Sequence, residues 1–171
     1  ITKENYIVLI LHPLSSELES SEQQMETLLK ALGKLCTSHN YQVVCIPPNS
    51  DPGSHKMKMV LEKYSEKDWL IKAETLPRLQ FINLMRHARA LVGNSSMGIL
   101  EAPHYKLPVV NIGNRQQGRL NAGNVEFVPY INAQFKYDSR SILGDSPCAQ
   151  TNLMGNFIKG DIDGNKIMNL Q

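Results

Sequence analysis

The sequence predicts an α/β fold organised around a doubly wound parallel sheet, and two observations predict it. Short runs of β-branched residues and leucine recur without polar alternation, as in strands that are buried on both faces. Segments with one apolar stripe at helical spacing separate these runs, and this alternation implies right-handed crossovers between parallel strands. With 171 residues, of which 42% are hydrophobic and 20% charged, the chain is long enough to bury a sizeable core.

The first half of the chain alternates three apolar runs with two helical patterns. Ser20 or Ser21 is expected to cap the first helix, because serine hydroxyls accept hydrogen bonds from the free amides of a first turn. Pro47 and Pro48 end the second apolar run. In order, we expect a strand at 6–11, a helix from Ser20 or Ser21 to about Cys36, a strand at 41–46, a helix that carries residues 57–64 and a strand at 69–73.

The second half continues this alternation as far as residue 130. Pro77 suits the first turn of a helix whose apolar stripe runs from Phe81 to Ala88. A short helix is expected from Ser95 onward, and strands are expected at 90–93, 108–112 and 125–128. We therefore expect an α/β domain at residues 1–130. The remainder, 131–171, loses periodicity and is expected to form a separate tail, with a terminal helix near residues 162–170.

Composition and charge exclude several classes of protein. The 18 Lys and Arg residues nearly balance 16 Asp and Glu residues, which leaves no electrostatic footprint for nucleic acid or an anionic membrane. The longest purely apolar run, residues 7–11, is far shorter than the roughly 20 residues that span a bilayer. Three cysteines without C-x-x-C spacing, and no signal-peptide pattern, predict buried or idle thiols in a reducing, cytoplasmic compartment. The chain begins at Ile1, close to its first strand, and we expect it to be a piece of a longer polypeptide.

Polar segments follow four of the expected strands. An open α/β sheet binds ligands beyond the carboxyl ends of its strands, so these segments should meet at one edge. They are His12-Pro13, Asn49 with residues 51–54, residues 93–98, and residues 113–119. Cofactor and metal signals are lacking: the sequence has no G-x-G-x-x-G, Walker-type or G-x-S-x-G motif, and its five histidines show no metal-ligand spacing.

Residues 93–101 are the most informative of these segments. Two hydroxyls, Ser95 and Ser96, together with free amides at a helix start, would favour a phosphate, and Glu101 could accept both hydroxyls of a ribose. Alternatively, the serines only cap the helix and Glu101 is a solvated surface acid. Gly98 would allow the ligand or a neighbouring loop to approach closely.

Two basic groups add to this pattern. Arg115, like Arg119, lies in a glycine-bounded loop that could close over phosphate oxygens, and His12 could bind a diphosphate or carry a proton. The alternatives are a solvated loop arginine and a hydrogen-bonded loop histidine.

Four segments, taken in order, resemble a known family. Residues 93–101 (GNSSMGILE) and 107–119 (LPVVNIGNRQQGR) resemble the carboxyl-terminal domain of UDP-N-acetylglucosamine 2-epimerases. Residues 11–16 (LHPLSS) and 48–54 (PNSDPGS) are similar to the hydrolysing branch, which makes N-acetylmannosamine for sialic acid synthesis. The resemblance covers about residues 6–128. It departs at Leu100, where an arginine often precedes the glutamate, and in the tail after Tyr130.

The resemblance implies a fold, a reaction and a set of ligand-binding residues. The fold would be the Rossmann-like half of a two-domain glycosyltransferase-B-type enzyme, with UDP in the interdomain cleft. UDP is eliminated to give a 2-acetamidoglucal, and water then adds to give the free sugar inverted at C2. His12 and Arg115 would act on the diphosphate or leaving UDP and are the candidate catalytic residues. The implied UDP-binding positions are His12, Asn49, Ser95, Ser96, Glu101 and Arg115, with Asn49 on the nucleotide.

The general acids and bases of this family lie in an amino-terminal domain that is absent from this sequence. We therefore expect the chain to bind UDP or a UDP-sugar but to be catalytically incomplete without that domain, within a parent protein that is a homo-oligomer. Two alternatives remain open. One is the nucleotide-binding half of a two-domain glycosyltransferase, and the other is a non-catalytic UDP-sugar-binding module.

Overall fold

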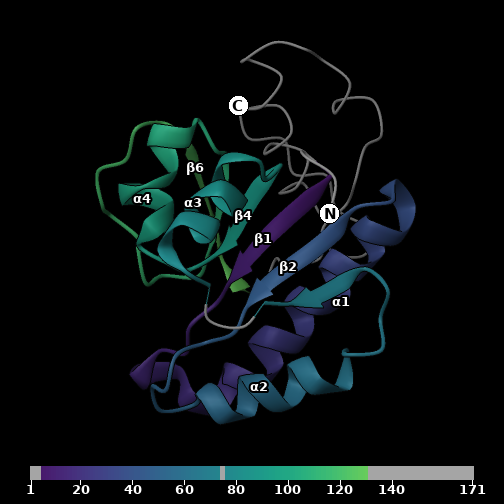
Figure 1. The fold of residues 1–171 in the computed structure, drawn as a ribbon. Coiled ribbons are helices and arrows are strands. Elements are labelled where there is room, and N and C mark those ends of the chain that lie inside the picture. Colours follow the sequence, from purple (N-terminus) through teal and green to yellow (C-terminus); the bar gives the residue numbers. More distant parts are fainter. Residues whose placement is uncertain (1–4, 74–75, 131–171) are drawn as a thin grey trace, which may run out of the picture.

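A six-stranded parallel sheet forms the centre of the molecule (Figure 1). The computed structural model describes residues 5–73 and 76–130. The strand order is β3-β2-β1-β4-β5-β6, and every neighbouring pair is parallel. The strands are β1 (Tyr6–Ile10), β2 (Gln42–Ile46), β3 (Leu70–Lys72), β4 (Ala90–Gly93), β5 (Val109–Ile112) and β6 (Val125–Val128).

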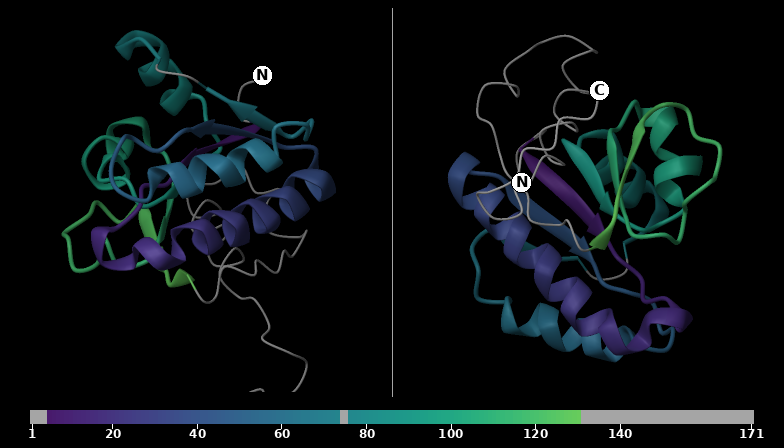
Figure 2. Two further views of the ribbon diagram at one scale, coloured as in Figure 1. Left: turned by 90° about the horizontal axis from the view of Figure 1, so that it is seen from below. Right: turned by 180° about the vertical axis from the view of Figure 1, so that it is seen from behind.

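Helices cover both faces of this sheet, as Figure 2 shows. Side chains alternate along β1, so Leu9 packs against the helices that follow β1 and β2, whereas Val8 packs in the cluster on the opposite face. The predicted doubly wound α/β fold is therefore confirmed. The helices are α1 (Ser21–His39) and α2 (Ser54–Lys63) on one face, and α3 (Arg78–Arg86), α4 (Met97–Leu100) and the 3₁₀ helix η2 (Ala102–Tyr105) on the other, with a further 3₁₀ helix, η1 (Ser15–Ser20), leading into α1.

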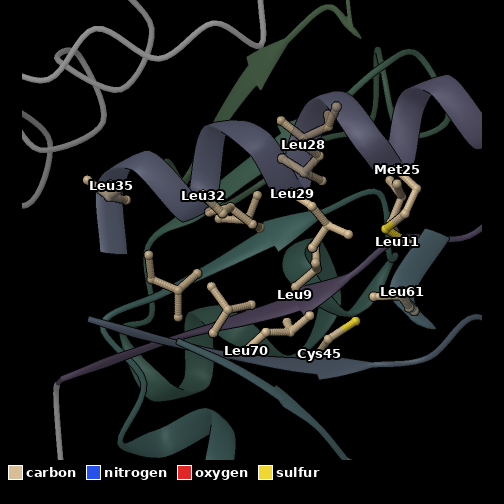
Figure 3. Close-up of a cluster of buried hydrophobic side chains, with 14 of the residues drawn as sticks. Leu9, Leu11, Met25, Leu28, Leu29, Leu32, Leu35, Cys45, Leu61 and Leu70 are labelled. Carbon is tan, nitrogen blue, oxygen red and sulfur yellow. The ribbon is translucent and has the colours of Figure 1, made fainter. Parts of the chain in front are cut away.

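The larger core cluster lies between α1 and the sheet (Figure 3). The apolar side chains at helical spacing along α1 are buried and face strand residues such as Leu9 and Cys45. They are Met25, Leu28, Leu29, Leu32 and Leu35. Burial raises the pKa of the Cys36 and Cys45 thiols to about 12, so neither is a thiolate at neutral pH. Cys148 lies outside the described residues.

Several local predictions need correction. The hydroxyls of Ser20 and Ser21 do not cap α1: each donates to a carbonyl of η1, to Glu17 O at 3.0 Å and to Leu18 O at 2.8 Å. The 3₁₀ helix η1, which was not predicted, supplies these acceptors. The serines lie where α1 begins, but their hydroxyls bond back to η1. Ala88 lies beyond the end of α3, although it packs in the same cluster.

The tail expected at 131–171, with its terminal helix, lies outside the described residues. Within residues 5–73 and 76–130, none of the helices combines the length and the apolar character that crossing a membrane requires.

Candidate functional site

The carboxyl edge of β1 and β4 is the point where the strand order reverses, and a buried asparagine lies there. Asn94, 0% exposed, directly follows β4. Its side chain accepts a hydrogen bond from the backbone N–H of His12 at 2.8 Å and donates to the carbonyl of His12 at 2.7 Å. Its amide also donates to the Tyr130 hydroxyl at 3.3 Å. The segments after β1 and β4 are thus joined at the switch point of the sheet, which is where open α/β sheets bind ligands.

A glycine makes this close approach possible. Gly93 has φ +140°, and a Cβ at this position would lie 1.9 Å from the carbonyl oxygen of Ile10. That oxygen instead accepts the Asn94 N–H at 3.1 Å. Only glycine allows β4 to end against β1 in this way.

His12 is half-buried beside charged and polar groups from three loops. Burial is the main cause that lowers the pKa of its imidazole, and the nearby Arg115 guanidinium lowers it further. Asp51 and a hydrogen bond with Asn49 act in the opposite direction. The Nδ1 atom is buried without a partner in the described part of the chain. A neutral imidazole in this position gains a proton more readily when an anion arrives.

The loop after β5 is tied to the same point. Gln116, only 3% exposed, donates from Nε2 to the carbonyl of Asn94 at 3.1 Å, and Arg115 donates to that carbonyl from Nη1 at 3.4 Å. The Arg115 side chain is therefore held at the edge while remaining exposed. Arg119 lies farther along this loop and is also exposed.

The two serines lie at the start of a helix that is shorter than expected. Ser95 Oγ accepts a weak hydrogen bond from the Met97 N–H at 3.4 Å, so this hydroxyl partly caps α4, whereas the Ser96 hydroxyl makes no capping bond. Because α4 spans four residues, its dipole contributes little, and an anion here would depend on discrete donors. Gly98 serves packing: a Cβ there would lie 2.7 Å from Val109 Cγ1.

Glu101 is paired rather than free. Its Oε2 accepts a hydrogen bond from Arg78 Nη2 at 2.8 Å, and its side chain is 30% exposed. The pair joins the start of α3 to the end of α4. Glu101 is therefore an ion-paired, partly exposed acid, and within residues 5–73 and 76–130 no donor bonds to its Oε1.

Asn49 lies on the exposed loop after β2. A cavity of about 780 Å³ adjoins it beyond the carboxyl ends of β2 and β3, lined in part by Ser50, Lys58, Glu62 and Lys72. Within residues 5–73 and 76–130, no three His, Cys, Asp or Glu side chains gather as metal ligands would.

The structure thus brings His12, Asn49 and Arg115 together, with Ser95 and Ser96 directly after Asn94. Sequence reasoning missed four contributors: Asn94, Gln116, Tyr130 and Arg78. Asn94 and Gln116 stood inside the highlighted segments, but only their buried contacts distinguish them from their polar neighbours.

Comparison with known proteins identifies the family. A family model described as UDP-N-acetylglucosamine 2-epimerase matches residues 1–158. The chain belongs to this family. The chain is similar to a UDP-N,N'-diacetylbacillosamine 2-epimerase (hydrolyzing) of Legionella pneumophila, 33% identical over 132 residues. The match covers 77% of this chain and 33% of that protein. A UDP-N-acetylglucosamine 2-epimerase of Neisseria meningitidis is 34% identical over 116 residues, or 68% of this chain and 29% of the relative.

Two solved structures share the fold. A Staphylococcus aureus MnaA–UDP co-structure matches with a TM-score of 0.64 at 18% identity, over 93% of this chain and 42% of that one. The Methanocaldococcus jannaschii UDP-GlcNAc 2-epimerase in complex with UDP-GlcNAc and UDP gives a TM-score of 0.60 at 10% identity, over 93% and 40% of the two chains. The chain spans about a third of the length of the curated relatives it matches.

Proposed function

We propose that this chain is the nucleotide-binding, carboxyl-terminal half of a hydrolysing UDP-N-acetylglucosamine 2-epimerase. The observation that carries the proposal is the joining of His12 and Arg115 at the β1–β4 edge through the single residue Asn94. Ser95 and Ser96 follow Asn94 directly in the chain, next to these two cationic or protonatable groups. Together they form a place suited to a diphosphate.

The remaining groups distribute along a nucleotide. Ser95 and Ser96 would hold the diphosphate, the free Oε1 of Glu101 would accept from the ribose hydroxyls, and Asn49 would contact the nucleotide. His12 and Arg115 would stabilise the departing UDP. The sugar would then extend into the cleft shared with an amino-terminal domain of the parent protein.

The chemistry sets what these residues must supply. In the elimination step, a base of the amino-terminal domain would take the C2 proton, the electron pair of the C2–H bond forms the C1=C2 double bond, and UDP leaves with the electron pair of the C1–O bond. Water then adds at C1 while C2 receives a proton on the opposite face, which gives the free N-acetylmannosamine. Charge develops on the diphosphate as the bond breaks, and fixed cations and donors stabilise it.

Relatives support the hydrolysing assignment. Two of them carry "(hydrolyzing)" in their names, and an Escherichia coli relative that is 30% identical is a polysialic acid biosynthesis protein. These names support a product that enters sialic acid synthesis. A cytoplasmic location and a homo-oligomeric parent enzyme stay predictions from the sequence. The family match favours this proposal over the alternatives of a glycosyltransferase half or a sensing module.

Calorimetric titration of the 171-residue chain tests the proposal. UDP should bind more tightly than uridine, and Arg115→Ala should remove most of this difference. Arg86→Ala is the matched control, because Arg86 is exposed at the far end of α3, away from the carboxyl edge. Equal affinity for UDP and uridine in the unmodified chain would overturn the diphosphate site.

A further inference from the structure

We infer that Asn94 is the positioning residue that fixes His12 and Arg115 relative to each other, a role that rests on the nucleotide site proposed above. The inference starts from the location of Asn94. The sheet ladder ends at Ile10 and Gly93, and Asn94 is the first residue beyond it. Past this point the sheet no longer holds the loops, so other bonds must set their geometry.

The side chain of Asn94 holds the loop after β1. Its oxygen and its amide nitrogen bond to the N–H and the C=O of the same residue, His12, at 2.8 and 2.7 Å. Two bonds to one residue fix both its position and its rotation. Asparagine suits this role because it presents a donor and an acceptor side by side, which aspartate and alanine do not.

The backbone of Asn94 holds the loop after β5. Its carbonyl accepts from Gln116 Nε2 at 3.1 Å and from Arg115 Nη1 at 3.4 Å. Because the same residue contacts both loops, a displacement of one is transmitted to the other. Tyr130 closes the far side of the Asn94 amide, and burial raises the pKa of its hydroxyl to about 12, which keeps the group neutral.

Nucleotide affinity provides the first test. Asn94→Ala should weaken UDP binding about tenfold and leave uridine binding within about twofold, because only the diphosphate contacts depend on His12 and Arg115. Asn124→Ala is the matched control: Asn124 is also a partly buried amide that bridges two carbonyls, Gly98 O and Leu107 O, but it precedes β6 at the opposite edge. It should lower the melting temperature and leave UDP affinity within about twofold.

Equal losses of UDP and uridine affinity in Asn94→Ala would show a purely structural role and overturn the inference. If Asn94→Ala does not fold, Gln116→Leu tests the other half of the arrangement, since leucine keeps the volume and removes the bond to the Asn94 carbonyl. Gln116→Leu should weaken UDP binding in the unmodified chain, and much less when Arg115 is already alanine. An equal loss in both backgrounds would contradict the inference.

The titration of His12, followed by NMR in the chain without nucleotide, gives a test that does not need UDP binding. Arg115, Asp51 and Asn49 face its imidazole, and burial lowers its pKa most. Releasing the loop in Asn94→Ala should raise the pKa of His12 toward its ordinary value, whereas Asn124→Ala should not change it. An unchanged His12 titration in folded Asn94→Ala would overturn the positioning role. If the unmodified chain fails to prefer UDP to uridine, the proposed function fails, and this readout still decides the role of Asn94.

Discussion

Glu101 shows how much a single side chain must do at this site. Its Oε2 bonds to Arg78, and the proposed function assigns its Oε1 to the hydroxyls of a ribose. With Arg78 more than half exposed, the ion pair contributes at most about 1 kcal/mol to stability. The pair therefore orients the carboxylate more than it stabilises the fold.

Glu101→Gln should weaken binding of UDP by about 1 to 3 kcal/mol, because a neutral amide accepts less strongly from two hydroxyls than a carboxylate does. Binding of 2′,3′-dideoxyuridine diphosphate should change much less, since that ligand lacks the hydroxyls. Calorimetry on both ligands separates the cases. An equal loss for the two ligands would assign Glu101 to the fold rather than to ribose.

His12 predicts two pH effects of opposite sign. The pKa of His12 in the folded chain lies below the ordinary value that the unfolded chain keeps. Between these two pKa values the unfolded chain binds more protons, so the free energy of unfolding falls as the pH falls below about 6.5. Binding of an anionic diphosphate favours the imidazolium, so affinity for UDP-N-acetylglucosamine should rise severalfold from about pH 8 to about pH 6. This ligand is preferred to UDP because its diphosphate has no terminal phosphate to titrate.

Thermal melts and calorimetry over this pH range measure the two effects. His12→Gln, which removes the titrating group, should flatten both profiles. An affinity profile that keeps its slope in His12→Gln would assign the proton uptake to another group.

Sequence reasoning located residues better than it located their contacts. The ends of β1, β2, β4 and β5 could be read from apolar runs, so the side chains that follow them were found. Asn94 and Gln116 are polar residues among polar residues, and their importance comes from bonds across 82 and 22 positions of the chain. Arg78 meets Glu101 only because α3 and α4 share one face of the sheet.

At the scale of elements, the strands and the short helix after Ser95 were predicted from the sequence, and the two 3₁₀ helices were not. A strand buried on both faces leaves a continuous apolar run, as β1 does. The two 3₁₀ helices have no such pattern, because their position depends on what they pack against. Ser20 and Ser21 at the start of α1 illustrate this. Their hydroxyls donate to carbonyls of η1 and so do not cap α1.

The contact between α4 and β5 makes a prediction at this scale. Gly98→Ala should destabilise the chain by about 1 to 3 kcal/mol, because the new methyl group meets Val109 at 2.7 Å. Combining it with Val109→Ala, which opens space at the contact, should recover part of the loss beyond additivity. Denaturant unfolding measures both. Strictly additive changes in the free energy of unfolding would mean that the contact between Gly98 and Val109 does not position α4.

At the scale of the whole molecule, the proposed function gives this chain one side of a ligand-binding cleft. We expect that it does not convert UDP-N-acetylglucosamine to N-acetylmannosamine by itself, because the reaction needs a base at C2 and acids near the ring. Glu101 pairs with Arg78, Glu62 pairs with Lys72 at the end of β3, and Glu22 pairs with Lys63 of α2. The elimination and the hydration each need a proton transfer at C2, and His12 alone would have to serve both.

Incubation of the purified chain with substrate, followed by chromatography of free N-acetylmannosamine, tests this expectation. Arg86→Ala, purified and assayed in the same way, is again the control and should behave as the unmodified chain does. Turnover that persists through purification and disappears in His12→Ala would place the catalytic groups within this chain.

The β1–β4 pairing also has a consequence for how the protein folds. His12 and Asn94 meet across 82 positions of the chain, so the site has no local precursor and appears only when the two central strands have paired. Contacts of such long sequence separation slow folding, because a large loop must close before they form. Recovery of UDP binding during refolding should therefore follow the slowest phase in which the sheet forms. UDP binding would then report when β1 and β4 have paired.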